Sequence, residues 1–132
     1  MNTIENNSNA SEELIVNNIL IAKFLGTQVR EEGIFKLPLS DNYLYTYNEL
    51  HFHSDWNWLM LVVDKLTDIG VEVSVLNVFH NQVFKYKYVS FCYHRFRLTN
   101  VLGVGENRYK DIISATYNAC VEFIKWYNTQ NN

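Results

Sequence analysis

The sequence predicts an α+β domain in which three helices pack on a small, mainly antiparallel sheet, in the order α-β-β-α-β-β-α. Three observations predict this class. Apolar residues recur at spacings of three and four in three segments, which is typical of amphipathic helices. In the segments between, they alternate with polar residues, as in strands buried on one face. Short turns join neighbouring strands, which favours antiparallel pairing with helices on one face.

The chain is expected to begin with a short tail that leads into the first helix. At 132 residues the chain has the length of one domain. The Asn-rich residues 1–10 predict a disordered tail, and residues 11–128 predict a single α+β domain. We expect Ser11 to cap the first helix, with glutamates in its first turn at the positive end of the dipole. Gly26 is expected to end this helix.

Two short strands are expected between Gln28 and Phe52, with a turn at Asp41-Asn42. Tyrosines alternate with other residues in the second of these strands, and Leu50 and Phe52 are expected to continue it.

The second helix follows directly. Ser54 is expected to cap it, Asp55 to lie in its first turn and Gly70 to end it. The last helix is predicted to run from about Asn107 to Asn128. Its apolar stripe is the widest of the three, so we expect this helix to be the best buried.

Between these helices the chain predicts a hairpin. Alternating valines from Val71 onward indicate a strand, and His80-Asn81 is expected to turn the chain into one long strand from Val83 to Arg97.

Cysteine usage and the absence of targeting signals predict a cytoplasmic protein. Cys92 and Cys120 lie in apolar segments, so we interpret them as buried thiols in a reducing compartment, with a single disulfide as the alternative. Residues 1–10 lack the basic and apolar regions of a signal peptide. The apolar stretches are too short to span a bilayer, so no membrane partner is expected.

Charge is distributed unevenly along the chain. Residues 1–72 hold 11 acidic and 4 basic residues, whereas residues 73–132 hold 3 acidic and 7 basic residues. The net charge is −3. Such an asymmetry indicates an oriented interaction with a charged partner and says nothing of the fold.

No motif in the sequence predicts a catalytic site, a metal site or a cofactor. His51, His53 and Asp55 are close in sequence and would suit zinc if further ligands converged on them. We favour local hydrogen bonding around the start of the second helix, because only two ligands are placed. Neither cysteine lies in a turn or at a helix start that would stabilise a thiolate. The glycines at 103 and 105 lack the rest of a phosphate-binding motif.

The predicted strand from Val83 to Arg97 carries the candidate partner-binding residues. Basic side chains at odd-numbered positions are expected to point together, with two aromatic rings between them. Cations and rings on one sheet face suit single-stranded RNA or a phosphate-bearing protein complex. The alternative, which alternation already explains, is a hairpin strand with an aromatic core face and a charged solvent face. The candidate residues are Lys85, Lys87, Phe91, Tyr93, Arg95 and Arg97.

Three blocks of the chain resemble a family of small uncharacterised proteins of phages and mobile elements of Bacteroidetes. The blocks are NNILIAKFLG at 17–26, HFHSDWNWLM at 51–60 and ATYNACVEFIKWYN at 115–128. The resemblance covers most of the chain, but residues 28–50 and 70–105 match no block. It implies no established activity and no catalytic residues. It does imply a mobile-element setting, in which small non-enzymatic proteins often block host defences.

The leading hypothesis is therefore a non-enzymatic inhibitor that covers a surface of a host defence protein or ribonucleoprotein. An anti-CRISPR that acts on an RNA-guided, RNA-targeting (type VI) nuclease in the host cytoplasm is its most specific form. A nucleic-acid-binding regulator that uses the basic and aromatic strand is one alternative. A self-associating scaffold protein is another, and the sequence leaves the oligomeric state open.

Overall fold

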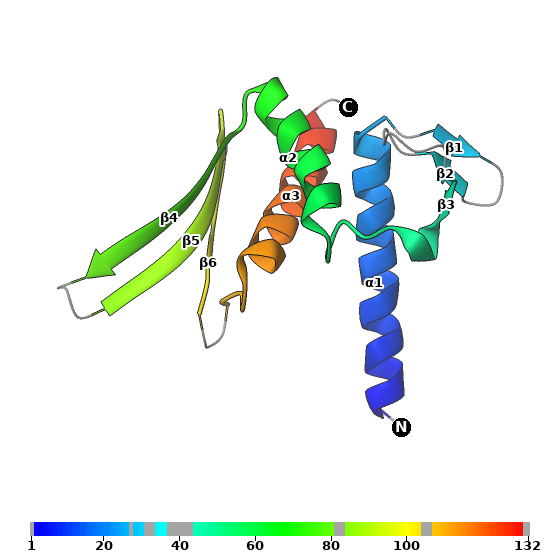
Figure 1. Ribbon diagram of the computed structural model, residues 1–132, viewed down its shortest axis with the longest axis horizontal. Coiled ribbons are helices and arrows are strands. Elements are labelled where there is room, and N and C mark those ends of the chain that lie inside the picture. Colours follow the sequence, from blue (N-terminus) through cyan, green and yellow to red (C-terminus); the bar gives the residue numbers. More distant parts are fainter. Residues whose placement is uncertain are drawn as a thin grey trace.

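The computed structural model (Figure 1) describes the backbone of residues 2–26, 28–30, 34–36, 44–80, 84–103 and 107–130. It describes side chains at residues 12–26, 36, 44–75, 87–103 and 107–130. Within these ranges the elements follow the order helix, three strands, helix, three strands, helix. The α+β class and the predicted order of helical and strand segments are therefore confirmed, and each strand segment contains three strands.

Helix α1 (Asn2–Phe24) is longer than the sequence predicts. It begins at Asn2 rather than at Ser11, so the predicted cap at Ser11 is wrong. No proline or glycine occurs before Gly26, and each Asn or Ser costs a helix only about 0.7 kcal/mol or less relative to alanine. The helix ends where Gly26 adopts a left-handed φ of 78°, as predicted.

The first sheet is antiparallel in the order β1-β2-β3 and consists of very short strands. These are β1 (Gln28–Arg30), β2 (Ile34–Lys36) and β3 (Tyr45–Thr46). The predicted turn at Asp41-Asn42 lies outside the described residues.

Strand β3 is followed by the 3-10 turn η2 (Tyr47–Glu49). The backbone N–H and the hydroxyl of Thr46 both donate to Glu49 Oε1, at 3.0 and 3.2 Å, and these bonds stabilise a turn instead of a continued strand. The prediction that Leu50 and Phe52 extend a strand is therefore wrong. Both side chains are nevertheless buried in the core.

Helix α2 (Trp56–Ile69) has defined caps at both ends. Asp55 is its N-cap, and its carboxylate accepts a hydrogen bond from the Asn57 backbone N–H at 2.8 Å. The predicted cap at Ser54 is thus one residue too early. Gly70 ends the helix with a φ of 118°, as expected, and its N–H donates to the Leu66 carbonyl.

The second sheet is antiparallel in the order β4-β5-β6. It contains β4 (Glu72–His80), β5 (Phe84–Tyr93) and β6 (Phe96–Val101). Strands β4 and β5 pair from Glu72↔Cys92 to His80↔Phe84, which confirms the predicted hairpin. The predicted continuous strand from Val83 to Arg97 is wrong, because the chain turns back at His94-Arg95.

Helix α3 (Ile112–Gln130) lies at the centre of the molecule. It begins later than the predicted Asn107, where the Asp111 carboxylate accepts the Ser114 N–H at 2.9 Å. Hydrogen bonding by the Ser114 side chain, followed by its backbone N–H, lowers the pKa of the Asp111 carboxyl. Helix α3 packs against β5 and β6 on one side and against α1 and α2 on the other. In Figure 1 the β4-β5-β6 sheet, α3, α1 and the small sheet follow one another across the view.

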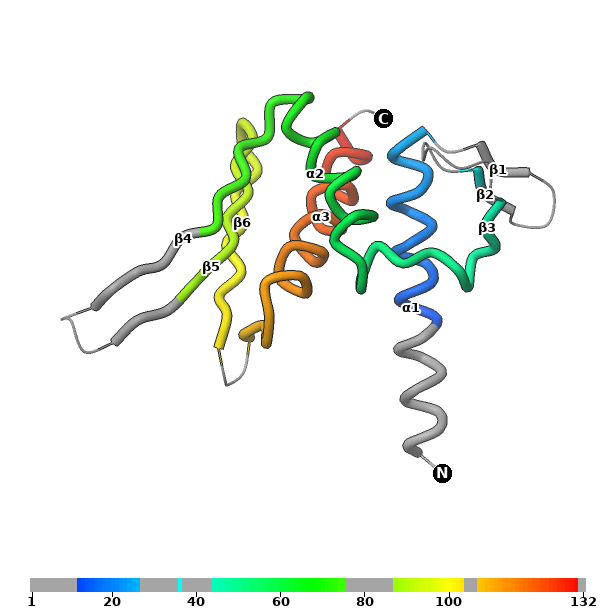
Figure 2. Tube along the Cα trace, viewed as in Figure 1, coloured from blue at the N-terminus to red at the C-terminus, as the bar shows by residue number. Residues whose placement is uncertain are grey.

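The core is formed between the second sheet and the helices. Helix α3 contributes more buried residues than any other described helix, which agrees with its wide apolar stripe. The described helices lie on one side of the β4-β5-β6 sheet, and no described element covers its other face (Figures 1 and 2). The largest fully buried side chains are Phe52, Phe91, Phe123, Ile21, Leu50, Leu59, Leu66 and Ile124.

Candidate interaction surface at the β5–β6 turn

Strand β5 presents its odd-numbered residues to helix α3. Val89 and Phe91 on this face are both 0% exposed. The prediction that Phe91 lines a partner-binding surface is therefore wrong, because its ring fills the core. Lys87 is on the same face by alternation and is half-buried. The side chain of Lys85 lies outside the described residues.

The turn between β5 and β6 separates the predicted basic residues. Tyr93 pairs with Phe96, so His94 and Arg95 form a two-residue turn in which His94 has a φ of 50°. Because β6 runs back along β5, its even-numbered residues face α3. Arg97 therefore lies on the uncovered face, where its guanidinium contacts the thiol of the cross-strand Cys92. The predicted single face of cations and rings is not formed.

Next to this turn, aromatic side chains from the sheet and from α3 form a cluster. The Phe123 ring centroid lies 5.5 Å from that of Tyr93 and 5.2 Å from that of Phe96, both edge to face. Trp126 lies 5.4 Å from Phe96, and Tyr127 stacks on Phe123 at 5.5 Å. Offset and edge-to-face pairs add about 0.5–1.5 kcal/mol beyond area burial. The cluster therefore holds the turn firmly against the end of α3.

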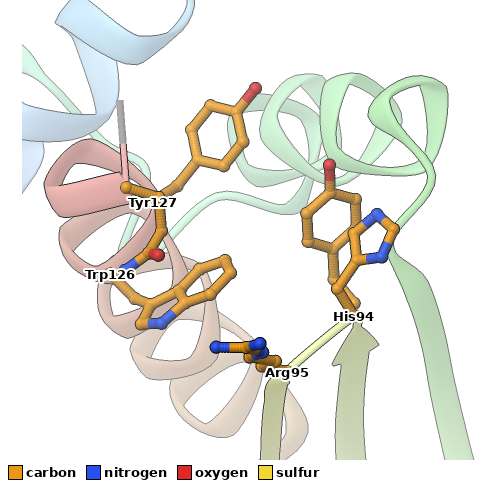
Figure 3. A pocket seen from close by; sticks show the side chains of 6 residues that line it. His94, Arg95, Trp126 and Tyr127 are labelled. Atoms are coloured by element: carbon orange, nitrogen blue, oxygen red, sulfur yellow. The ribbon is translucent and has the colours of Figure 1, made fainter. Parts of the chain in front are cut away.

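A depression opens where this cluster reaches the surface. It has a volume of about 330 Å³ and is lined by Tyr93, His94, Arg95, Trp126, Tyr127 and Gln130. Figure 3 shows His94 and Arg95 from the turn facing Trp126 and Tyr127 from α3 across the opening. We call this the turn pocket. It brings together two of the predicted site residues, Tyr93 and Arg95, with four that the sequence did not single out.

Arg95 supplies the positive charge of the turn pocket. It is exposed, and no acidic partner of Arg95 lies among the described residues. The ion pair found in the described part of the chain joins Lys125 to Glu122 at 3.5 Å. A guanidinium offers five N–H donors in a planar fork, which suits phosphate and carboxylate groups. The pocket therefore combines a free cation with flat rings.

A buried polar network lies on the opposite side of α3. Asn18 is 2% exposed, and its Nδ2 donates to the Leu50 carbonyl at 3.1 Å and lies 3.2 Å from His53 Nδ1. The Tyr117 hydroxyl donates to Asn18 Oδ1 at 3.0 Å. Burial, followed by the charge of His51, lowers the pKa of His53. Burial is also the main cause of the raised Tyr117 pKa.

The network borders a second depression of about 240 Å³ between α1 and η2. His51 and His53 both line it, with ring centroids 6.4 Å apart. The His51 ring packs edge to face on Trp58 at 5.5 Å, and Asp55 is engaged in capping α2. Asp55 thus makes the local hydrogen bond that the sequence favoured, whereas His51 makes a ring contact and His53 is bonded to Asn18, which is distant in sequence.

Groups suited to covalent or metal chemistry are spread apart in the described residues. Cys120 is buried, and burial raises the pKa of its thiol. Cys92 and Cys120 are both free thiols. No three His, Cys, Asp or Glu side chains in the described ranges lie close enough together to hold a metal ion. Among the described helices, none combines the length and apolar character needed to cross a membrane.

Comparisons with known proteins add no relative: no protein family, no curated protein and no solved structure matches the chain. The residues that the sequence missed, His94, Trp126, Tyr127 and Gln130, carried little signal. Trp126 and Tyr127 belong to the apolar stripe of α3 and were assigned to the core. His94-Arg95 is a polar pair within an aromatic run. Predicting a turn at this pair would have placed Arg95 next to the end of α3 and so indicated the site.

Proposed function

We propose that this chain is a non-enzymatic binding protein that acts in the host cytoplasm by covering a surface of a defence complex. The most specific form of the proposal is an anti-CRISPR that blocks an RNA-guided, RNA-targeting (type VI) nuclease. The resemblance of three sequence blocks to mobile-element proteins supports the setting. The turn pocket, where Arg95 lies beside Trp126 and Tyr127 with no acidic partner among the described residues, is the observation that supports a binding surface.

The distribution of charge in space supports an oriented interaction. The exposed acidic side chains among the described residues include four on α1 and α2, with two more on β4 and α3. Four exposed cations lie on the β5–β6 turn, on β6 and before α3, and the others are Lys23, Lys36 and Lys125. In Figure 1 α1 lies across α3 from the β4-β5-β6 sheet, whereas α2 lies beside α3 and ends next to that sheet. A molecule with separated charge is oriented by the field of a charged partner and binds it faster at low salt. The basic end would meet an anionic surface, such as guide RNA or an acidic protein patch.

The proposed mechanism is occlusion. A ribonucleoprotein nuclease must expose part of its guide RNA, or the channel around it, to bind a target strand. If the β5–β6 turn and the turn pocket occupied this surface, they would block the target strand without a catalytic group. The affinity would then depend on a few central residues, of the Arg and Trp type that dominates binding energy at interfaces.

The test is capture of a guide-loaded type VI nuclease by the tagged chain, followed by size-exclusion chromatography. We expect a stable complex that inhibits target cleavage. The double variant R95A/R97A should weaken the complex at least about tenfold, because each lost charge-assisted contact is worth about 1.5–3 kcal/mol. The matched control is K23A, which removes an exposed lysine from α1 in the acidic half. No complex with the nuclease, or equal losses in both variants, would contradict the proposal.

The second candidate function is a regulator that binds RNA on its own. The observation that favours it is the same pairing of Arg95 with exposed ring faces, which RNA-binding surfaces use. This function predicts binding to free RNA that weakens steeply as salt rises, since phosphate counterions are released. Electrophoretic mobility shifts at low and high salt, in the absence of any protein partner, separate it from the inhibitor.

A further inference from the structure

The turn pocket has walls of different chemistry. One wall is the His94 ring, which packs edge to face on Tyr93 at 4.4 Å between ring centroids. The facing wall is formed by Trp126 and Tyr127 of α3, as Figure 3 shows. The volume of about 330 Å³ is at the lower end of the range for small-molecule sites, about 300–1,000 Å³. The pocket thus has room for one flat ring system with its substituents and no more.

The rings are held in place from behind, so the pocket exists before a ligand arrives. Trp126 lies 5.9 Å from Phe123 and 5.4 Å from Phe96, and Tyr93 lies 5.5 Å from Phe123. Phe123 itself is fully buried. Both Trp126 and Tyr127 are half-buried, which leaves part of each ring at the surface. A ligand ring can therefore pack on them without the cost of ordering these side chains first.

Electrostatics decide which ligand fits beside the rings. Arg95 carries a full positive charge and has no acidic partner among the described residues. The pocket also borders the last turn of α3, whose carbonyl end carries about half a negative charge. An anionic group is therefore favoured on the Arg95 side of the mouth, away from that carbonyl end. The ring-lined side has no charge requirement.

We propose that the turn pocket binds one nucleotide of single-stranded RNA, with the base packed between His94 and Trp126 and the phosphate on the Arg95 guanidinium. This inference deepens the proposed function, because it names RNA as what the basic end of the chain contacts in a ribonucleoprotein. A base offers a flat face for packing on an aromatic side chain, and such stacking tolerates any base. An acidic peptide would use Arg95 but leave the ring walls without a flat partner.

The experiment is fluorescence anisotropy of a labelled oligouridine of about eight nucleotides, a usual site length for single strands, at about 50 mM salt. We expect R95A to weaken binding about tenfold and to make the salt slope less steep by about 0.7, the value for one phosphate contact on a single strand. The matched control is K125A on the same end of α3. Because Lys125 is already paired with Glu122, its loss should change binding less than about twofold.

A second variant tests the rings without emptying the core. W126F keeps an aromatic ring against Phe96 but removes the indole from the pocket. An oligoadenine should quench part of the tryptophan emission of the wild-type protein and leave the emission of W126F unchanged. If both proteins are quenched alike, the base does not lie on Trp126 and the proposal is overturned.

Two further probes distinguish a nucleotide from other anions. Inorganic polyphosphate has the charge but not the bases, and a polyglutamate peptide has carboxylates instead of phosphates. We expect both to compete poorly with oligouridine. Equal competition by either one overturns the proposal, as does the absence of RNA binding at low salt. If RNA does not bind and the nuclease is still captured, this inference fails while the proposed inhibitor function stands.

Discussion

Replacing Tyr117 by Phe tests the buried polar network that joins the two ends of the chain. Tyr117 on α3 and Asn18 on α1 are 99 residues apart, and the Tyr117 hydroxyl donates to Asn18 Oδ1 at 3.0 Å. The two other hydrogen bonds of Asn18 use its Nδ2, to Leu50 and to His53, so they do not satisfy its oxygen. Asn18 is 2% exposed, which leaves little access for water. Y117F keeps the ring and removes only this donor.

The expected loss of unfolding free energy follows from that geometry. An ordinary neutral hydrogen bond contributes about 0.5–1.5 kcal/mol, whereas a buried acceptor left unsatisfied costs about 1–3 kcal/mol. Because Asn18 Oδ1 loses its donor and stays buried, we expect a loss of about 1–3 kcal/mol. Urea denaturation followed by circular dichroism measures this loss. For a chain of this size it lowers the urea midpoint by roughly 0.5–2 M.

The matched control is Y127F on the same helix. Tyr127 is half-buried, and its hydroxyl makes no hydrogen bond that the described residues show. We expect Y127F to change the unfolding free energy by less than about 0.5 kcal/mol. Our prediction is refuted if Y117F is as stable as the wild type, or if both variants lose the same unfolding free energy. The hydrogen bond from Tyr117 to Asn18 would then make no specific contribution to stability.

Three further predictions concern the core and its titration. F91A should lower the unfolding free energy measured by urea denaturation by about 3–5 kcal/mol, and R95A should lower it by less than about 0.5 kcal/mol. Equal losses would contradict the burial of Phe91 in the core. T116V should stabilise the fold by about 1 kcal/mol, because the buried Thr116 hydroxyl has no hydrogen-bond partner among the described residues; a loss of stability would show that it has one. The lowered pKa of His53 means that its stabilising contribution is complete above about pH 6.5 and decreases as the pH falls through that value, since the unfolded chain then binds the proton more readily. H53Q should remove this part of the pH dependence, and an unchanged pH profile would contradict it.

Much of the fold is predictable from the sequence because most elements have local signals. Gly26 and Gly70 end helices at left-handed positions, and the alternating valines of β4 form a strand. The failures occurred where local signals competed. Asp55 rather than Ser54 caps α2, although both types are good caps. The turn at η2 depends on a hydrogen bond between Thr46 and Glu49 that the alternation of tyrosines concealed.

The candidate site was harder to predict than the fold. Alternation in a strand assigns faces only as long as the strand continues, and a two-residue turn reverses the assignment for everything after it. The sequence therefore placed Arg97 beside Phe91, whereas the structure places them on opposite faces. The rings of Trp126 and Tyr127 could not be assigned to the site, because a helix stripe does not show where its partner sheet ends. Where the sheet ends relative to α3 is decided only by how the two elements pack against each other.

The position of the turn pocket follows from the way the core ends. The chain reverses direction at His94-Arg95, beside the last turns of α3. The aromatic rings that cover Phe123 therefore face the core on one side and solvent on the other. Exposed rings alone would favour contact with any apolar surface. The Arg95 guanidinium at the mouth, which has no ion-pair partner in the part of the chain that the structure describes, changes this preference, because an apolar partner would have to bury that charge. Arg95, which lies in the turn between β5 and β6, therefore selects a ligand that is flat and anionic. We expect R95A to weaken binding of such a ligand and to let the pocket accept uncharged flat ligands as well.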